Sequence, residues 1–204
     1  IWGFAAESFE SFGIGYAPKG WQDLITAATG AGYQPQEMVS AGLAMESDKG
    51  GYDRFRGRVL WPIRDANSQV LGFGARRLYE EDQGPKYLNT PETPVYHKSS
   101  VLYGLDLARK SIVKTRQIVV VEGYTDVMAC HLAGIQTAVA TCGTAFGEDH
   151  IKIINRLLGQ SSEPAEVIFT FDPDAAGEKA ALRVYGDSSK FNALTFTTTP
   201  PLAL

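Results

Sequence analysis

The chain has 204 residues, of which 44% are hydrophobic and 21% charged, so it can bury a core in one domain or two small ones. It contains no apolar run of about 18 residues and no basic, apolar leader, so the sequence predicts neither a membrane span nor a secretory signal. Cys130 and Cys142 lack Cys-x-x-Cys spacing. They favour two buried thiols in a reducing, cytoplasmic compartment.

The net charge of −4 is unevenly distributed along the chain. Residues 49–116 hold 13 of the 19 Lys and Arg against 7 Asp and Glu, a local charge of +6, whereas the remainder carries −10. A basic half joined to an acidic half suits a protein that binds phosphates with one part and metal ions with the other. Ordinary fluctuation of charge along a chain is the alternative.

The first half is predicted to be a mixed α+β region. Residues 1–45 are typical of short helices separated by Gly and Pro. Two strands follow at 58–64 and 70–74, and the polar turn between them predicts a hairpin. Residues 80–100 contain three prolines and are predicted to form an ordered but irregular loop.

From about residue 104 the pattern changes to alternating strands and helices. Apolar, β-branched runs predict strands at 118–121, 137–140 and 167–171, and the segments between and after them predict helices at 125–132, 148–158 and 175–185. This alternation predicts a parallel sheet covered by helices on both faces, so the fold class is α/β. The boundary between the two halves is expected within residues 104–116.

Three carboxylates are predicted to lie on one rim of this sheet. Glu122 directly follows the first strand, Asp172 directly follows the third, and Asp174 comes two residues later. In parallel α/β sheets, active sites form outside the carboxyl ends of the strands. Clustered negative charges need cations, and oxygen ligands on an open rim suit Mg²⁺, which keeps water and phosphate oxygens among its ligands. Such ions can activate a hydroxyl nucleophile and stabilise a departing pyrophosphate.

Each acid also has a purely structural interpretation. The dipole of the following helix could stabilise Glu122, and Asp172 or Asp174 could cap the next helix. Asp126, one turn into the first helix, is either a partner of the metal ligands or plain surface, and its position favours surface. The turn at 141–144 also precedes a helix, where backbone amides can cradle a phosphate, although any strand-to-helix turn looks similar.

Cations and aromatic residues are interleaved in the first half. Four arginines alternate along a segment predicted to be extended, so they would project to one side of it: Arg54, Arg56, Arg58 and Arg64. Further cations and rings follow on the hairpin and loop, and the set comprises Arg76, Arg77, Lys86 and Lys98 with Tyr52, Phe55, Tyr87 and Tyr96. This pattern is typical of a groove for single-stranded nucleic acid. A solvated basic face over core aromatics would show the same pattern.

Several blocks of residues resemble a known family. Residues 121–126, Val-Glu-Gly-Tyr-Thr-Asp, resemble the first motif of the toprim domain, and residues 171–177, Phe-Asp-Pro-Asp-Ala-Ala-Gly, resemble its Asp-x-Asp motif. Toprim domains occur in primases, topoisomerases and nucleases, so this motif pair alone does not choose among them. The first half resembles, in order, the RNA polymerase domain of bacterial DnaG-type primases at 12–21, 52–65, 85–93, 97–98 and 102–104. The resemblance covers about residues 1–192.

The resemblance implies a basic, mixed α+β N-terminal subdomain at 1–110 and a toprim subdomain at 111–204 whose parallel sheet is flanked by helices. It implies synthesis of short RNA primers on a single-stranded DNA template from ribonucleoside triphosphates. Glu122, Asp172 and Asp174 would be the catalytic and metal-binding acids. The cations expected to contact template or nucleotide are Arg56, Arg64, Arg76, Arg77, Lys86 and Lys98.

The resemblance also implies cofactors and partners. The cofactor would be Mg²⁺, with Mn²⁺ as the alternative, and no zinc is expected in this segment. The replicative helicase would bind through a region outside the chain, no membrane contact is expected, and a monomer is the default expectation. The start at Ile1 rather than Met is consistent with a segment of a longer polypeptide.

Two features depart from the family pattern. Pro173 occupies a position that is often Gly, which stiffens the loop without removing a carboxylate. The family continues into a third acidic motif, whereas residues 195–204 contain no acid. The toprim subdomain is therefore expected to be truncated at its C-terminus, with a weakened metal site and an exposed sheet edge. Two other functions stay open: a non-catalytic nucleic-acid-binding fragment, and another toprim enzyme resembling a nuclease or topoisomerase.

Overall fold

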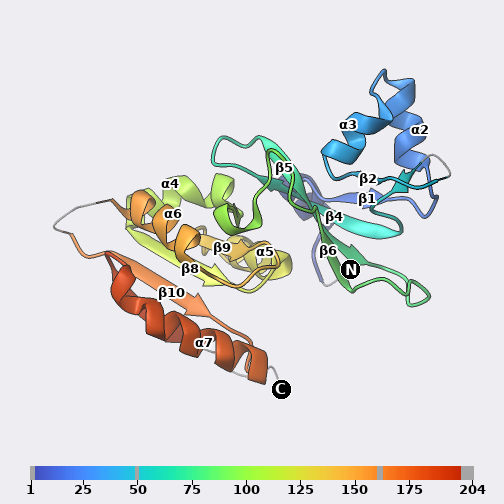
Figure 1. Ribbon diagram of the computed structural model, residues 1–204. Helices are drawn as coiled ribbons and strands as arrows, with labels where there is room; N and C mark the ends of the chain where they lie inside the picture. Colours follow the sequence, from blue (N-terminus) through green and yellow to red (C-terminus); the bar gives the residue numbers. More distant parts are fainter. Residues whose placement is uncertain (1–2, 49–50, 160–162, 199–204) are drawn as a thin grey trace. The chain divides into compact units, whose positions relative to one another are not determined.

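The computed structural model describes residues 3–48, 51–159 and 163–198. The chain divides into two compact units, Ile1–Ile63 with Val70–His97 and Arg64–Gln69 with Lys98–Leu204. Each unit is described by itself (Figure 1). Within the described ranges, no helix is long and apolar enough to cross a membrane.

The first unit is a mixed α+β structure. One sheet has the strand order β1-β4-β5-β6, and β2 and β3 form a separate ribbon. β1 pairs antiparallel with β4, and β6 pairs antiparallel with β5. Its elements are α1 (Ala6–Phe12), β1 (Gly15–Ala17), α2 (Asp23–Gly30), α3 (Pro35–Ser40), β2 (Ala44–Met45), β3 (Tyr52–Asp53), β4 (Arg58–Arg64), β5 (Val70–Arg77) and β6 (Tyr87–Asn89).

The predicted hairpin is present, with nearly all of its two strands in the first unit and its turn in the segment Arg64–Gln69 that belongs to the second. β4 and β5 are hydrogen-bonded neighbours, and the Asp65 carboxylate holds the turn between them by accepting hydrogen bonds from the backbone N–H groups of Asn67 and Gln69 at 2.8 and 2.9 Å. The prediction of an irregular loop over 80–100 is wrong at β6, since three of its residues pair with β5. A three-residue edge strand between prolines carries too short a pattern to be predicted.

The second unit has the predicted α/β architecture. Its sheet has the order β11-β10-β8-β9-β7, in which β8 pairs parallel with β9 and β10, β10 pairs parallel with β11, and β7 pairs antiparallel with β9. Its elements are η1 (Lys98–Ser100), β7 (Leu102–Tyr103), α4 (Leu105–Thr115), β8 (Gln117–Val121), α5 (Tyr124–Leu132), β9 (Ala138–Thr141), α6 (Glu148–Leu158), β10 (Glu166–Thr170), α7 (Ala175–Asp187), η2 (Ser188–Lys190) and β11 (Leu194–Thr198).

The buried core of the second unit explains why these strands are continuous apolar runs. Ile118, Val139, Val167 and Phe169 are fully buried between the sheet and its helices. β-Branched and aromatic residues fill a sheet that is covered on both faces, so the strands are continuous apolar runs. β11 forms one edge of the sheet. Residues 199–204, part of the stretch without the expected acids, lie outside the described residues.

Candidate functional site

The register of two neighbouring parallel strands brings the predicted acids together. Val120 of β8 lies beside Phe169 of β10, so the chain leaves both strands at the same edge of the sheet. At that edge the backbone N–H of Asp172 donates a hydrogen bond to Glu122 Oε1 at 2.7 Å. The expected juxtaposition of Glu122 and Asp172 is therefore present.

The loop after β10 is fixed by hydrogen bonds and by one glycine. The Asp174 N–H donates to the Asp172 carbonyl at 2.8 Å, and Asp174 Oδ1 accepts from the Gly177 N–H at 2.8 Å. Asp174 thus caps the start of α7, as the structural interpretation of this residue expected. A Cβ on Gly177 would lie 2.1 Å from the Asp172 carbonyl oxygen, so only glycine allows helix and loop to approach this closely.

The electrostatics of the rim are those of crowded carboxylates. Partial burial raises the pKa of Glu122, and the charges of Asp172, Asp174 and Asp126 raise it further, against the opposing effect of the hydrogen bond from Asp172. Partial burial likewise raises the pKa of Asp126, with the Asp172 charge adding to the effect. These shifts show that the acids share one region of negative potential.

Asp126 is the acid that sequence reasoning set aside as surface. Its side chain is exposed, as expected, and Asp126 Oδ2 accepts a hydrogen bond from the Gly123 N–H at 2.9 Å. Asp126 nevertheless interacts with the charges of Glu122 and Asp172. The signal that could have found it is its place three residues after Gly123, the residue that precedes α5, because an acid at that position folds back onto the start of the helix, beside Glu122.

The donor set at this rim fits a hard divalent cation. Among the residues that the structure describes, no three His, Cys, Asp or Glu side chains converge closely enough to enclose a metal ion. Mg²⁺ is usually held by one or two carboxylates, with water and substrate phosphates as its other ligands. The neighbouring acids Glu122 and Asp172, at an open edge that accumulates negative charge, provide such a partial set.

Glu122→Gln should stabilise the metal-free protein near neutral pH. The pKa of Glu122 is raised above the usual value of about 4.3, so its ionised form costs folding free energy at neutral pH. The amide oxygen of Gln can still accept the hydrogen bond from Asp172. The expected gain is roughly 0.5 kcal/mol after solvent screening. The gain should vanish as the pH falls below about 4, where the carboxyl is neutral in both the folded and unfolded states.

Urea denaturation in the presence of a chelator, repeated over a series of pH values, would measure this difference. A variant less stable than the parent near neutral pH would contradict the argument. It would mean that the carboxylate gains more from its hydrogen bond than it loses to the neighbouring charges.

The sheet edge that carries Glu122, Asp172, Asp174 and Asp126 is called the acidic rim. A cavity of about 200 Å³ within the second unit adjoins it at Glu122. Glu122 lines it, together with Thr141, Thr144, Arg183 and the ring of Phe171. Thr141 and Thr144 belong to the turn between β9 and α6 that sequence reasoning considered as a weak phosphate cradle. The turn thus opens beside Glu122, and the cavity brings two threonines and Arg183 of α7 together with that one acid.

The cations of the first half do not form the predicted row. Arg54 and Arg56 lie between β3 and β4, outside either strand, and Gly57 turns the chain with φ +59°. Arg58 begins β4 but is only 3% exposed. The expectation that Arg54, Arg56, Arg58 and Arg64 project to one side of an extended segment is therefore wrong, because a left-handed glycine interrupts the segment.

Two of the arginines hold a loop of the first unit. Arg58 Nη2 lies 2.7 Å from Asp82 Oδ2, and Arg58 Nη1 donates to the Pro85 carbonyl at 2.8 Å. Arg77 Nη1 donates to the carbonyls of Asp82 and Gly84 at 2.7 and 3.1 Å. Both guanidinium groups are engaged with the segment 82–85.

The remaining predicted cations are divided between the two units. In the first unit, Arg76 and Lys86 lie about equally far from the exposed Tyr87 ring, at 5.8 and 5.9 Å from its centroid. Arg64 and Lys98 belong to the second unit, where Arg64 Nη1 donates to the Ser68 carbonyl at 3.0 Å. The cluster around Tyr87 keeps the combination of cations and a ring that a single-strand groove requires.

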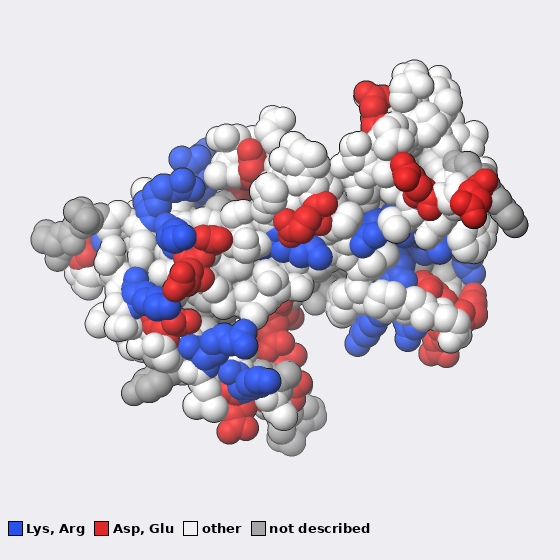
Figure 2. All heavy atoms as spheres, viewed as in Figure 1, with Lys and Arg blue, Asp and Glu red and all other residues white. Residues whose placement is uncertain are grey.

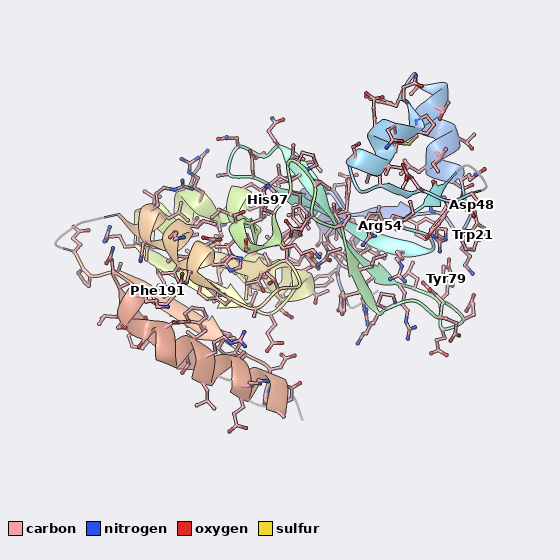
Figure 3. All side chains as sticks on the ribbon, in the orientation of Figure 1. Trp21, Asp48, Arg54, Tyr79, His97 and Phe191 are labelled. Carbon is pink, nitrogen blue, oxygen red and sulfur yellow. The ribbon has the colours of Figure 1, made fainter. Side chains whose placement is uncertain are left out.

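A cavity of about 720 Å³ in the first unit gathers cations and rings that the sequence pattern did not connect. Figure 2 shows Lys and Arg side chains beside Asp and Glu side chains on this unit, and Figure 3 labels three residues of the lining, Trp21, Arg54 and Tyr79. Lys19 and Arg56 also line it, and Lys19 Nζ lies 3.4 Å from the centroid of the Tyr79 ring. These residues lie up to 60 positions apart in the sequence, so no local motif predicts the cavity.

Comparison with known proteins identifies the family. The family model described as "DNA primase catalytic core, N-terminal domain" matches residues 2–109, and the toprim domain model matches residues 116–197. The DNA primase of Streptomyces coelicolor is 59% identical over 199 residues, which are 98% of this chain and 31% of that protein. The chain thus spans less than a third of the length of this curated relative.

Solved structures agree with this match over the whole fold. The crystal structure of the RNA polymerase domain of Mycobacterium tuberculosis primase DnaG has a TM-score of 0.93 and 46% identity, covering 100% of this chain and 66% of that one. The same domain in complex with a double-stranded DNA oligomer with a 6-nucleotide overhang has a TM-score of 0.90 and 45% identity, covering 100% and 64%. The chain therefore belongs to the DnaG-type DNA primases and carries the N-terminal part of their catalytic core followed by a toprim domain.

Proposed function

We propose that the chain is the catalytic core of a DNA primase, which synthesises short RNA primers on a single-stranded DNA template by metal-dependent nucleotidyl transfer. The observation that carries the proposal is the acidic rim, where Glu122 accepts a hydrogen bond from Asp172 and shares a negative potential with Asp126 and Asp174. Membership in the primase family and the DNA complex of the M. tuberculosis relative support it.

Asp172 and Asp174 would hold the divalent cation, with Glu122 as a further ligand or as the base, and Asp126 is close enough to add to the attraction for the ion. Mg²⁺ suits this oxygen donor set, and Mn²⁺ is the alternative. When bound, the ion would stabilise the negative charge that develops on the triphosphate. The primer hydroxyl oxygen bonds to the α-phosphorus of the incoming nucleotide as the bond to pyrophosphate breaks. As the base, Glu122 would accept the hydroxyl proton.

The substrates and partners follow from this reaction. They are a single-stranded DNA template, ribonucleoside triphosphates and the growing RNA primer, in the cytoplasm. Arg56, Arg76, Arg77 and Lys86 of the first unit and Arg64 and Lys98 of the second are the proposed contacts to template or nucleotide. The replicative helicase would bind a part of the whole protein outside this chain, and the chain itself would act as a monomer.

Ribonucleotide incorporation on a single-stranded DNA template is the direct test. Labelled RNA should appear with Mg²⁺ and ribonucleotides present, and a chelator should remove it. Binding of the template without any incorporation would instead favour the non-catalytic alternative. Cleavage of the DNA with Mg²⁺ would favour a nuclease.

Lys86→Ala should weaken the binding of single-stranded DNA templates by the same factor, whatever the base sequence of the template. Lys86 is exposed beside the Tyr87 ring, where its charge can face a phosphate without contacting a base. Loss of one phosphate contact should reduce the slope of log K against log salt by about 0.7 for a single strand. Fluorescence anisotropy of a labelled oligonucleotide over a salt series measures both quantities.

Lys110→Ala is the matched control for this prediction, because it removes the same charge from an exposed position on α4. Its salt slope should equal that of the parent. Equal slopes for the parent and Lys86→Ala would remove Lys86 from the binding surface.

A further inference from the structure

The first unit contains an apolar cavity of about 330 Å³, a volume at the lower end of the usual range for sites that hold small molecules. Helix α2 and the strands β1, β4 and β5 contribute residues to its wall. The apolar part of the wall includes Leu24, Leu43, Phe55, Leu60 and Phe73. None of the described residues that line the cavity of about 720 Å³ belongs to this wall, so the two cavities are distinct.

The apolar wall belongs to a core that packing leaves incomplete. Phe55 is part of a small buried cluster, and Leu43, Leu60 and Phe73 pack against it but stay only half-buried. Helix α2 contributes Leu24, which is still 38% exposed, and no residue of α2 is buried. A space beside apolar groups lacks the dispersion contacts that a filled core makes. A molecule that fills this space would supply those contacts and exclude water from the wall.

The polar groups of the wall are already engaged. Both carboxylate oxygens of Asp53 accept hydrogen bonds from backbone N–H groups of α2, at 2.7 and 3.0 Å. Asp23 Oδ2 accepts from the Gly20 N–H at 2.9 Å, and the hydroxyls of Tyr16 and Tyr79 share a hydrogen bond of 3.2 Å. The described residues of the wall include no Lys, Arg or His. An anion therefore gains no partner there, and a cation would lose hydration without gaining a free buried carboxylate.

We infer that this cavity is a binding site for a neutral, planar molecule with one or two aromatic rings. The rings of Phe55 and Phe73 meet edge to face in its wall, with centroids 6.4 Å apart and planes at 68°. A ligand ring can extend this arrangement, since aromatic rings prefer offset or edge-to-face contacts at such distances. The site is independent of the proposed function, because neither the acidic rim nor the proposed template contacts belong to its wall.

Indole is the probe for this site, since it is neutral, planar and aromatic. Isothermal titration calorimetry with the parent chain should give a dissociation constant of about 1 mM or lower. The heat-capacity change of binding should be negative, because apolar surface is buried. Indole-3-carboxylate and tryptamine carry the same rings with a negative and a positive charge. Each should bind at least about tenfold more weakly than indole, because the wall offers neither charge a free partner.

Two neighbouring positions on α2 provide a matched pair of variants. Ala27 and Thr26 are both exposed, but of the two only Ala27 lines the cavity. Ala27→Phe places a ring in the cavity and should lower the affinity for indole at least about tenfold. Thr26→Phe adds the same ring outside the cavity and should leave the affinity unchanged. Circular dichroism should show both variants folded, since neither position is buried.

Nuclear Overhauser effects would locate the bound probe in the parent chain. They should join indole protons to the methyl groups of Leu43 and Leu60. Effects that reach Trp21 or Tyr79 instead would place indole in the cavity of about 720 Å³ and overturn the assignment. Equal affinities for indole and either charged analogue would overturn the class of ligand. No binding of indole, or an unchanged affinity in Ala27→Phe, would overturn the site, whatever the result of the ribonucleotide incorporation test.

Discussion

Asp172→Ala should lower template-directed ribonucleotide incorporation by more than about 100-fold, because changes to residues that merely support metal ligands already cost 10–100-fold. The Asp172 side chain is exposed at the rim, so its loss removes a carboxylate without opening a cavity in the core. Its backbone N–H, which donates to Glu122, is retained in alanine. The expected result is a folded chain whose metal-dependent step is lost.

The measurement compares initial rates of incorporation for Asp172→Ala and the parent at several Mg²⁺ concentrations, with circular dichroism to confirm folding. Glu178→Gln is the matched control, since it removes one exposed acid from the first turn of α7 and should leave the rate unchanged. Synthesis by Asp172→Ala at the parental rate would refute the assignment of this carboxylate. Asp174 is a less clean choice, because its side chain also caps α7 through Gly177.

The strands and acids of the toprim half were predictable because the patterns that indicate them lie within a few consecutive residues. A strand covered on both faces must be apolar throughout, and the first polar residue after it marks the carboxyl end where active sites form. Glu122 and Asp172 were found in this way, and the structure joins them by a hydrogen bond of 2.7 Å from the Asp172 backbone N–H to Glu122 Oε1. The short strands β6 and β7 carried no such signal, since each has only two or three residues and takes its position from a neighbour.

The basic half was less predictable because the role of an arginine depends on a distant partner. Arg58 resembles Arg56 in the sequence, two positions away in the same basic run, yet Arg58 is buried against Asp82 and Arg56 lies on the Trp21 ring. The partners are 24 and 35 residues distant, beyond any strand or helix period. Local alternation could therefore indicate a basic surface but not which cations are used to hold the fold.

Asp82→Ala is expected to lower the free energy of unfolding, which would show that Arg58 stabilises the fold. Arg58 is 3% exposed, and its only ion pair in the described part of the chain is with Asp82. Removal of one partner leaves a buried charge uncompensated, which costs 3–5 kcal/mol for fully buried pairs and about 2 kcal/mol here, because the Asp82 side chain is still 28% exposed. Guanidinium or urea denaturation near neutral pH would measure the loss.

The neighbouring residue provides the control for this second prediction. Glu81→Ala breaks the Lys19 pair, whose side chains are 56% and 72% exposed, and should leave the unfolding midpoint unchanged because solvent screens exposed pairs. Adding Arg58→Met to Asp82→Ala should recover part of the loss, since an apolar side chain of similar length removes the unpaired charge. If the single and double variants were equally unstable, the missing stability would come from another contact of Asp82, the hydrogen bond that its Oδ1 accepts from the Gly84 N–H at 2.7 Å, rather than from the unpaired charge.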